Sequence, residues 1–147
     1  MKINLTQSSF VKLLCAALLA VAASGYAAEN NAGAEKAATT AAQTWLTEID
    51  NGDYTQSWQE ASAFFRSAVT KDKWKTSLET VRKPLGKLTS RKVKKAQSAA
   101  SLPGAPDGQY VVVQFDTVFA DKPSAVETVT FMLENDGQWR AAGYFIK

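Results

Sequence analysis

The amino-acid sequence predicts an α+β domain in which three N-terminal helices pack on one face of a four-stranded antiparallel sheet. The first observation is that apolar residues between positions 34 and 83 recur every three or four residues, which is typical of helices with one buried side. The second is that this spacing changes to two from residue 87 onward, which is typical of strands with one buried face. Helices and strands that are segregated along a chain in this way favour a layered α+β architecture.

The first helix is expected from Ala34 to Asp50. The pair Asn51-Gly52 should end it, with Gly52 in the left-handed conformation that glycine adopts easily after a helix. The side that should be buried carries apolar residues at helical spacing: Ala38, Ala41, Ala42, Trp45, Leu46 and Ile49.

Two further helices should follow. The second is expected over residues 53–69, with Asp53 as its N-terminal cap, and the third should begin at Thr70 and end before Pro84 and Gly86. The buried side of the second helix is expected to carry Trp58, Ala61, Phe64, Phe65 and Ala68. The buried side of the third is expected to carry Trp74, Leu78 and Val81.

Four strands are expected after the helices. Residues 109–120, 125–133 and 139–145 alternate between apolar and other residues, so each strand has one apolar face. Residues 88–96 form a plausible fourth strand, and its lysines are typical of an exposed sheet edge. The order is compatible with a nuclear-transport-factor-like cone or a cystatin-like arrangement, and the sequence does not choose between them.

The turns predict the register of the last three strands. Asn135-Asp136-Gly137 fits a three-residue hairpin loop with Gly137 in the left-handed conformation. A second three-residue loop is expected at Lys122-Pro123-Ser124. Together these loops place odd-numbered residues on the apolar face. The expected opposite pairs are Leu133 with Trp139, Phe131 with Ala141, Phe119 with Glu127, and Phe115 with Phe131.

The N-terminus has the features of a secretory signal peptide. Lys2 and Lys12 precede an apolar run over residues 13–23, and small residues follow as far as Ala27. The run is about half of the roughly 20 residues that a membrane-spanning helix needs, and no second run of this kind follows. We therefore expect export to the periplasm or the extracellular space. The expected organisation is a signal peptide (1–27), a flexible tether (28–33) and a single domain (34–147).

Composition excludes several classes of chemistry. The 147 residues include no histidine, and the single cysteine, Cys15, lies in the predicted signal peptide. Zinc, haem, thiol and histidine-based sites are therefore not expected. The sequence has no glycine-rich phosphate-binding pattern, so no cofactor is expected. Nucleic acid is not expected as a partner either, because aromatic residues are not interleaved with the lysines.

Glu127 is the most informative single residue, because alternation places its carboxylate on the apolar face near Phe145. A buried carboxylate is costly unless it is paired, and the candidate partners are Arg82, Arg91 and Arg140. One interpretation is a polar floor to a ligand pocket that orients a small polar molecule, or a general acid or base with a raised pKa. The other is a structural ion pair at the margin of the sheet, or a shifted register that leaves Glu127 exposed.

A basic segment over residues 71–95 carries ten lysines and arginines against two acids. The residues proposed as a basic face are Lys87, Lys92, Lys94 and Lys95. Such a face would attract an anionic component of the cell envelope. The simpler interpretation is an edge strand whose lysines prevent pairing with other chains.

Several motifs together resemble a family of secreted bacterial proteins known only as domain of unknown function 4019. They are Trp45, Ile49–Tyr54, Ser57-Trp58, Arg82–Gly86, Ser90-Arg91, Leu102–Gly108, Glu127–Val129, Gly137–Arg140 and Gly143–Ile146. The resemblance covers nearly the whole mature chain and implies export and a single compact domain. It supplies no catalytic residues.

The sequence thus predicts an exported, non-enzymatic binding domain that is a monomer or a weak homodimer. Its ligand would be a small polar molecule between helices and sheet or an anionic envelope component on the basic face. One alternative is an enzyme without histidine that uses Glu127 with an arginine partner. Another is a structural or assembly partner in the cell envelope, which would recruit a second chain through the exposed face or edge of its sheet.

Overall fold

The computed structural model describes the backbone of residues 8–147 and the side chains of residues 29–147. The chain divides into two compact units between Gly33 and Ala34, and the second unit extends to Lys147. Helix α1 (Ser8–Asn51) includes residues from both units. The predicted signal peptide falls on residues that lie outside the described side chains, and its first seven lie outside the described backbone.

Residues 28–33, which were expected to form a flexible tether, are helical in the structure and belong to α1. The segment contains no proline, and its single glycine, Gly33, lowers helix stability by only about 1 kcal/mol. Its polar composition therefore indicates exposure to water and not an interrupted helix.

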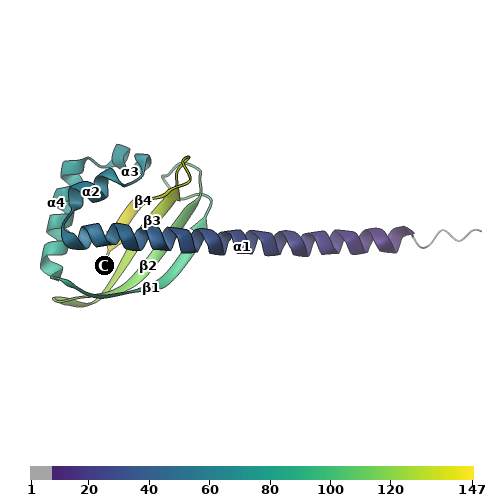
Figure 1. The fold of residues 1–147 in the computed structure, drawn as a ribbon, viewed down its shortest axis with the longest axis horizontal. Helices are drawn as coiled ribbons and strands as arrows, with labels where there is room; N and C mark the ends of the chain where they lie inside the picture. Colours follow the sequence, from purple (N-terminus) through teal and green to yellow (C-terminus); the bar gives the residue numbers. More distant parts are fainter. Residues whose placement is uncertain (1–7) are drawn as a thin grey trace, which may run out of the picture. The chain divides into compact units, whose positions relative to one another are not determined.

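The unit Ala34–Lys147 is an α+β domain in which helices precede an open antiparallel sheet, as predicted (Figure 1). Neighbouring strands in the chain are neighbours in the sheet, with the order β1-β2-β3-β4. After α1 the elements are α2 (Tyr54–Gln59), α3 (Ala63–Ala68), α4 (Lys71–Arg82), a 3-10 turn (Lys83–Leu85), β1 (Leu88–Ala99), β2 (Tyr110–Phe119), β3 (Lys122–Leu133) and β4 (Trp139–Ile146).

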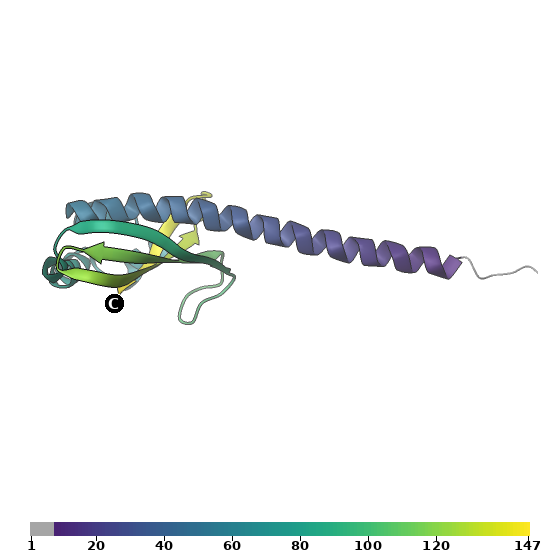
Figure 2. The same cartoon turned by 90° about the horizontal axis from the view of Figure 1, so that it is seen from below.

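The C-terminal part of α1 lies along one face of the sheet (Figure 2). Its predicted apolar stripe forms the core together with odd-numbered residues of β2 and β3. Gly52 ends the helix with a φ of +83°, as expected. The buried members of this core include Ala38, Ala42, Trp45, Leu46, Ile49, Val111, Val113, Phe115, Val129 and Phe131.

The single helix predicted over residues 53–69 is wrong, because the chain forms two short helices, α2 and α3. The hydroxyl of Ser62 accepts a hydrogen bond from the Phe65 backbone N–H and so starts a new helix. The backbone N–H of Ser62 donates to the Ala141 carbonyl of β4 at 2.8 Å, which holds the break against the sheet. Asp53 lies at the expected N-cap position of α2, but its side chain makes no capping hydrogen bond.

Helix α4 begins at the predicted cap, where the Thr70 hydroxyl accepts from the Lys73 N–H. Trp74 and Leu78 are buried as expected, but Val81 is 41% exposed and Arg82 is buried in its place. The helix therefore turns a charged side chain toward the sheet at its C-terminal end, where its positive charge is also favoured by the helix dipole.

The predicted apolar face of the sheet is confirmed, because the odd-numbered residues of β2 from Val111 to Phe119 and of β3 from Ala125 to Phe131 are buried. The β3–β4 hairpin has the predicted register, with Leu133 opposite Trp139 and Gly137 at a φ of +78°. Strand β1 forms one edge of the sheet, as its lysines indicated.

The predicted register between β2 and β3 is wrong. Phe115 lies opposite Glu127, and Val111 lies opposite Phe131. The expected loop over residues 122–124 is part of β3, and the turn consists of Ala120 and Asp121 alone. Relative to the prediction, the partner of Glu127 on β2 changes by four residues, from Phe119 to Phe115. Because side chains alternate between the two faces of a strand, a shift by an even number leaves Glu127 on the predicted face.

The end of β4 also differs from the prediction, because the register shifts between Ala141 and Gly143. The extra residue reverses which side chains face the core. Tyr144 therefore lies on the apolar face opposite Val129, and Phe145 is 57% exposed on the other face. The expected proximity of Phe145 to Glu127 is wrong for this reason.

Among the described residues, no helix combines the length and the apolar character needed to cross a membrane.

Candidate functional site

A buried ionic cluster, here called the Glu127 network, joins six elements of the domain. Two carboxylates and two guanidinium groups form it, together with two hydroxyl groups. The members are Asp50 of α1, Arg82 of α4, Arg91 of β1, Thr117 of β2, Glu127 of β3 and Tyr144 of β4.

Glu127 is fully buried and its two carboxylate oxygens accept five hydrogen bonds. Oε1 accepts from the Tyr144 hydroxyl at 2.7 Å, from Arg82 Nη1 at 3.1 Å and from Arg91 Nη2 at 3.2 Å. Oε2 accepts from Arg91 Nε at 2.6 Å and from the Thr117 hydroxyl at 2.8 Å. A carboxylate has about four lone-pair positions, so these donors use its whole accepting capacity.

Asp50 binds the opposite side of the two arginines. Its Oδ1 accepts from Arg82 Nη2 at 2.6 Å, and its Oδ2 accepts from Arg91 Nη1 at 2.6 Å. Each guanidinium group therefore lies between two carboxylates, and the four formal charges cancel. Arg82 also stacks on Phe119, with 4.6 Å between its Cζ and the centre of the ring.

Mutual pairing stabilises the charged forms in this low-dielectric site. Burial by itself lowers the pKa of Arg91, but hydrogen bonds and negative charge from Asp50 and Glu127 outweigh that effect and raise its pKa above the ordinary value. Burial and the nearby Glu127 charge raise the pKa of Tyr144, so its hydroxyl keeps the proton that it donates. The charged groups of the network are thus paired with one another.

Sequence reasoning found three members of this network, namely Arg82, Arg91 and Glu127. It missed Asp50, which was interpreted as part of a helix end, although Asp50 follows Leu46 by four residues on the buried side of α1. It also missed Thr117, whose odd number placed it on the apolar face. Tyr144 gave no signal, because the register shift in β4 that turns it inward is not evident from alternation.

Arg140, the fourth predicted member, lies elsewhere. It pairs with Asp136 at the β3–β4 hairpin through two hydrogen bonds of 2.8 and 2.7 Å. These bonds lower the pKa of Asp136 to about 2, so the pair is ionised at neutral pH. Arg140 therefore belongs to a different surface, the wall of a cleft.

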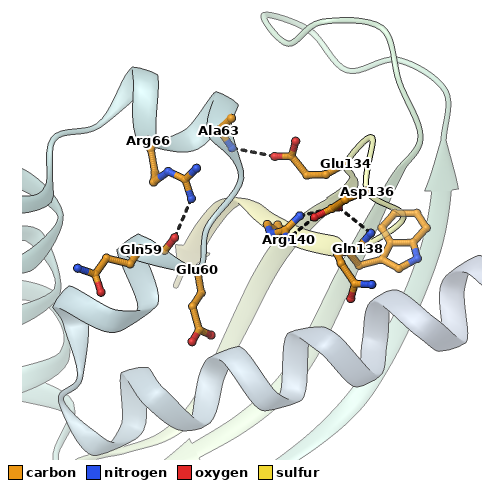
Figure 3. Close-up of a pocket in the computed structure, with 9 residues that line it drawn as sticks. Gln59, Glu60, Ala63, Arg66, Glu134, Asp136, Gln138 and Arg140 are labelled. Carbon is orange, nitrogen blue, oxygen red and sulfur yellow. Dashed lines mark hydrogen bonds and ion pairs between the residues drawn. The ribbon is translucent and has the colours of Figure 1, made fainter.

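This cleft, here called the polar cleft, has a volume of about 620 Å³ and lies between the α2–α3 break and the β3–β4 hairpin (Figure 3). The Ala63 N–H at the start of α3 donates to Glu134 Oε1 of the hairpin at 2.8 Å, which links the two walls. The lining residues are Gln59, Glu60, Ala63, Arg66, Glu134, Asp136, Gln138, Trp139 and Arg140.

Several polar groups in the cleft are not used by the protein. Arg66 donates from Nη1 to the carbonyls of Gln59 and Ala61, at 2.7 and 2.6 Å, which leaves its Nε and Nη2 groups without a partner among the described residues. The second oxygen of Glu134 is likewise without a donor there. The side-chain amides of Gln59 and Gln138 are exposed and make no hydrogen bond within the described part of the chain.

Glu60, which lines the cleft, has a second acidic side chain as a neighbour, Glu48 of α1. Glu60 accepts from the Gln56 amide at 2.6 Å and faces Glu48 of α1. Burial, a hydrogen bond with Glu60 and the negative charges of Glu60 and Asp53 raise the pKa of Glu48 to about 7. The Oε2 atom of Glu48 is buried without a hydrogen-bond partner among the described residues.

The predicted basic face is exposed, since Lys87, Lys92, Lys94 and Lys95 all lie at the surface. Lys94 pairs with Asp116 of β2 at 3.0 Å. Lys92 and Lys95 lie opposite Asp116 and Gln114, on the face of the sheet away from α1. The two arginines of the basic segment are largely buried in the Glu127 network, so the positive surface charge of this segment comes from its lysines.

A model for a family described as protein of unknown function (DUF4019) matches residues 41–144. The chain belongs to this family. The part matched by the DUF4019 model begins before Asp50 and ends at Tyr144, so it contains all six members of the Glu127 network and the whole polar cleft. No curated protein and no solved structure matches the chain.

Replacing Glu127 by Gln should lower the free energy of unfolding by about 3–5 kcal/mol. The physical reason is that Arg82 and Arg91 would keep two buried positive charges that Asp50 alone does not balance. Chemical denaturation at neutral pH measures this change.

Two further variants calibrate that result. Tyr144→Phe removes one donor to Glu127 and keeps all four charges, so it should cost less, about 1–3 kcal/mol. Asp116→Asn is the matched control, because that carboxylate pairs with Lys94 at the surface, and it should change stability by less than about 1 kcal/mol. Equal losses for the Glu127 and Asp116 variants would contradict a stabilising buried network.

Glu48 should make stability depend on pH between 4.5, its ordinary pKa, and about 7, its pKa in the fold. In this interval the folded state binds more protons than the unfolded state. The stabilising contribution of Glu48 to the free energy of unfolding is therefore fully present below pH 4.5 and is lost as the pH rises through 7. Glu48→Gln should remove it, and the variant should gain stability relative to the parent as the pH rises. Denaturation curves at pH 4.5, 6 and 7.5 measure the difference, with Glu79→Gln as a surface control. If the stabilities of the parent and of Glu48→Gln change with pH in the same way, Glu48 does not hold an extra proton in the folded state.

Proposed function

We propose that this protein is an exported, non-enzymatic binding domain that takes a small polar ligand in the polar cleft. The observation that carries the proposal is the contrast between the two polar sites. In the Glu127 network every oxygen and every guanidinium group is engaged with a partner. In the polar cleft, Arg66, Glu134, Gln59 and Gln138 present groups that the described protein atoms leave free.

Ligand sites need polar groups that are positioned but not satisfied, because a ligand must replace the water bound to them. Arg66 meets this condition, since its Nη1 is fixed by two backbone carbonyls while the rest of the guanidinium faces the cleft (Figure 3). Glu134 meets it as well, because one oxygen is anchored at the start of α3. Both side chains are therefore held in place before a ligand arrives, which reduces the entropy cost of binding.

Export is proposed from the N-terminal pattern of lysine, a short apolar run and small residues.

The order of helices and strands is compatible with a nuclear-transport-factor-like or a cystatin-like arrangement. The proposal depends on neither, because the cleft lies at the β3–β4 hairpin and not within a cone. The geometry gives no support to Glu127 as a general acid or base, since its carboxylate has no exposed surface.

The proposal predicts that small polar compounds bind at the α2–α3 break and the hairpin. In an NMR titration of the full chain with amino acids, dicarboxylates and sugars, the amide shifts that change should map to residues 59–66 and 134–140. Gln59→Ala and Gln138→Ala should weaken binding without loss of stability, because neither side chain is bonded within the described chain. Gln97→Ala, an exposed glutamine on β1, is the matched control. Shift changes in other regions alone, or none with any compound, would refute the proposal.

A second candidate function is the attachment of an anionic envelope component to the lysines of β1. The observation that favours it is the exposure of Lys92 and Lys95 on the face of the sheet away from α1, where only Asp116 offers a nearby opposite charge among the residues described. Such a surface attracts anions over a distance of about 10 Å at moderate ionic strength.

Binding to vesicles tests this candidate. The full chain should sediment with phosphatidylglycerol vesicles and not with phosphatidylcholine vesicles, and rising salt should release it. Lys92→Glu with Lys95→Glu should abolish sedimentation. Lys71→Glu with Lys73→Glu changes the net charge equally on α4 and is the control. Equal effects of the two double variants would indicate attraction by overall charge instead of a site on β1.

A further inference from the structure

We propose that the ligand of the polar cleft is a saccharide that packs against the indole ring of Trp139. This inference rests on the proposed function and adds the chemical class of the ligand. It depends on three features of the described residues: the state of the four indole N–H groups, the mixture of donors and acceptors in the cleft, and the balance of charge there.

The indole N–H groups distinguish Trp139 from the other three tryptophans. Trp45 donates to the Ser57 carbonyl at 2.8 Å, and Trp74 donates to the Ser57 hydroxyl at 3.1 Å. Trp58 donates to the Val69 carbonyl at 2.7 Å. Trp139 has no such partner among the described residues, although its ring packs partly against the core and lines the cleft. Its apolar body is thus fixed by the protein while its polar group remains available.

The free groups of the cleft match hydroxyl groups better than they match an ion. Each hydroxyl of a sugar both donates and accepts a hydrogen bond. The cleft supplies donors from Arg66 and Trp139, acceptors from Glu134, and groups of both kinds from the amides of Gln59 and Gln138. The C–H face of a sugar ring is apolar, so it can pack on an indole while the hydroxyls at its rim reach the polar side chains.

The charges of the cleft disfavour a strongly ionic ligand. Asp136 and Arg140 neutralise each other through their paired hydrogen bonds. Arg66 remains, together with Glu60 and Glu134. A dicarboxylate or phosphate would be repelled by the two acids, and an ammonium group, although attracted by the acids, would be repelled by Arg66. A neutral ligand with many hydroxyls avoids both penalties, and a volume of about 620 Å³ gives room for a short oligosaccharide.

Calorimetric titration of the full chain with chitobiose, cellobiose and maltose tests the inference, with glutarate and putrescine as ionic comparisons. At least one disaccharide should bind more tightly than either ion. Trp139→Phe, which keeps an aromatic ring and removes the N–H, should weaken that binding about tenfold, which corresponds to about 1.4 kcal/mol. Trp58→Phe is the matched control, because its N–H is used within the protein, and it should bind the disaccharide as the parent does.

Tryptophan fluorescence supplies a second measurement that does not depend on calorimetric heats. A disaccharide should change the emission of the parent and of Trp58→Phe, and this change should be absent in Trp139→Phe. If glutarate or putrescine shifts the amides of the cleft and no disaccharide does, the saccharide inference is overturned while the proposed function stands. If no compound shifts the amides of the cleft, both are overturned.

Discussion

The balance of charge around Glu127 is the constraint on which the arrangement of this domain depends. A fully buried carboxylate requires compensating charge, and two arginines from α4 and β1 provide it. Two arginines would leave an excess positive charge, and Asp50 at the end of α1 balances it. Because each charge comes from a different element, the relative positions of α1, α4 and the sheet are fixed together. Loss of any one group would leave an uncompensated charge in the interior.

The same domain separates structural polar groups from polar groups that a ligand can reach. The Glu127 network is internally paired, because its carboxylates, guanidinium groups and hydroxyls bond to one another and are largely buried. The polar cleft lies where the helical segment breaks at Ser62, and there the chain ends one helix, starts another and bonds to β4. A continuous helix would satisfy those backbone groups by itself and would not place Arg66 and Glu134 around a common space. The irregular segment is thus what creates the candidate binding site.

Some features of the sheet follow from local patterns in the sequence, and others depend on contacts between strands. Alternation in β2 and β3 correctly placed Glu127 on the apolar face, because side-chain direction in a strand depends only on odd or even position. The pairing of β2 with β3 was wrong by four residues, since it depends on where the turn forms, and a two-residue turn at Ala120 and Asp121 replaced the expected loop. The reversal in β4 that turns Tyr144 inward requires an extra residue opposite β3, which no pattern in β4 alone indicates.

The amino-acid sequence is enough to establish the α+β class, the buried side of α1, the apolar faces of β2 and β3, the need of Glu127 for a positive partner, and the absence of histidine. These properties follow from composition and from periodicity along the chain. The packing of helices against the sheet then selects Arg82 and Arg91 as the partners, brings Asp50 and Tyr144 into the network, and places Arg140 in a separate cleft. The physical reason is that these choices depend on distances between side chains that are far apart in the sequence, and such distances exist only once helices and sheet have packed.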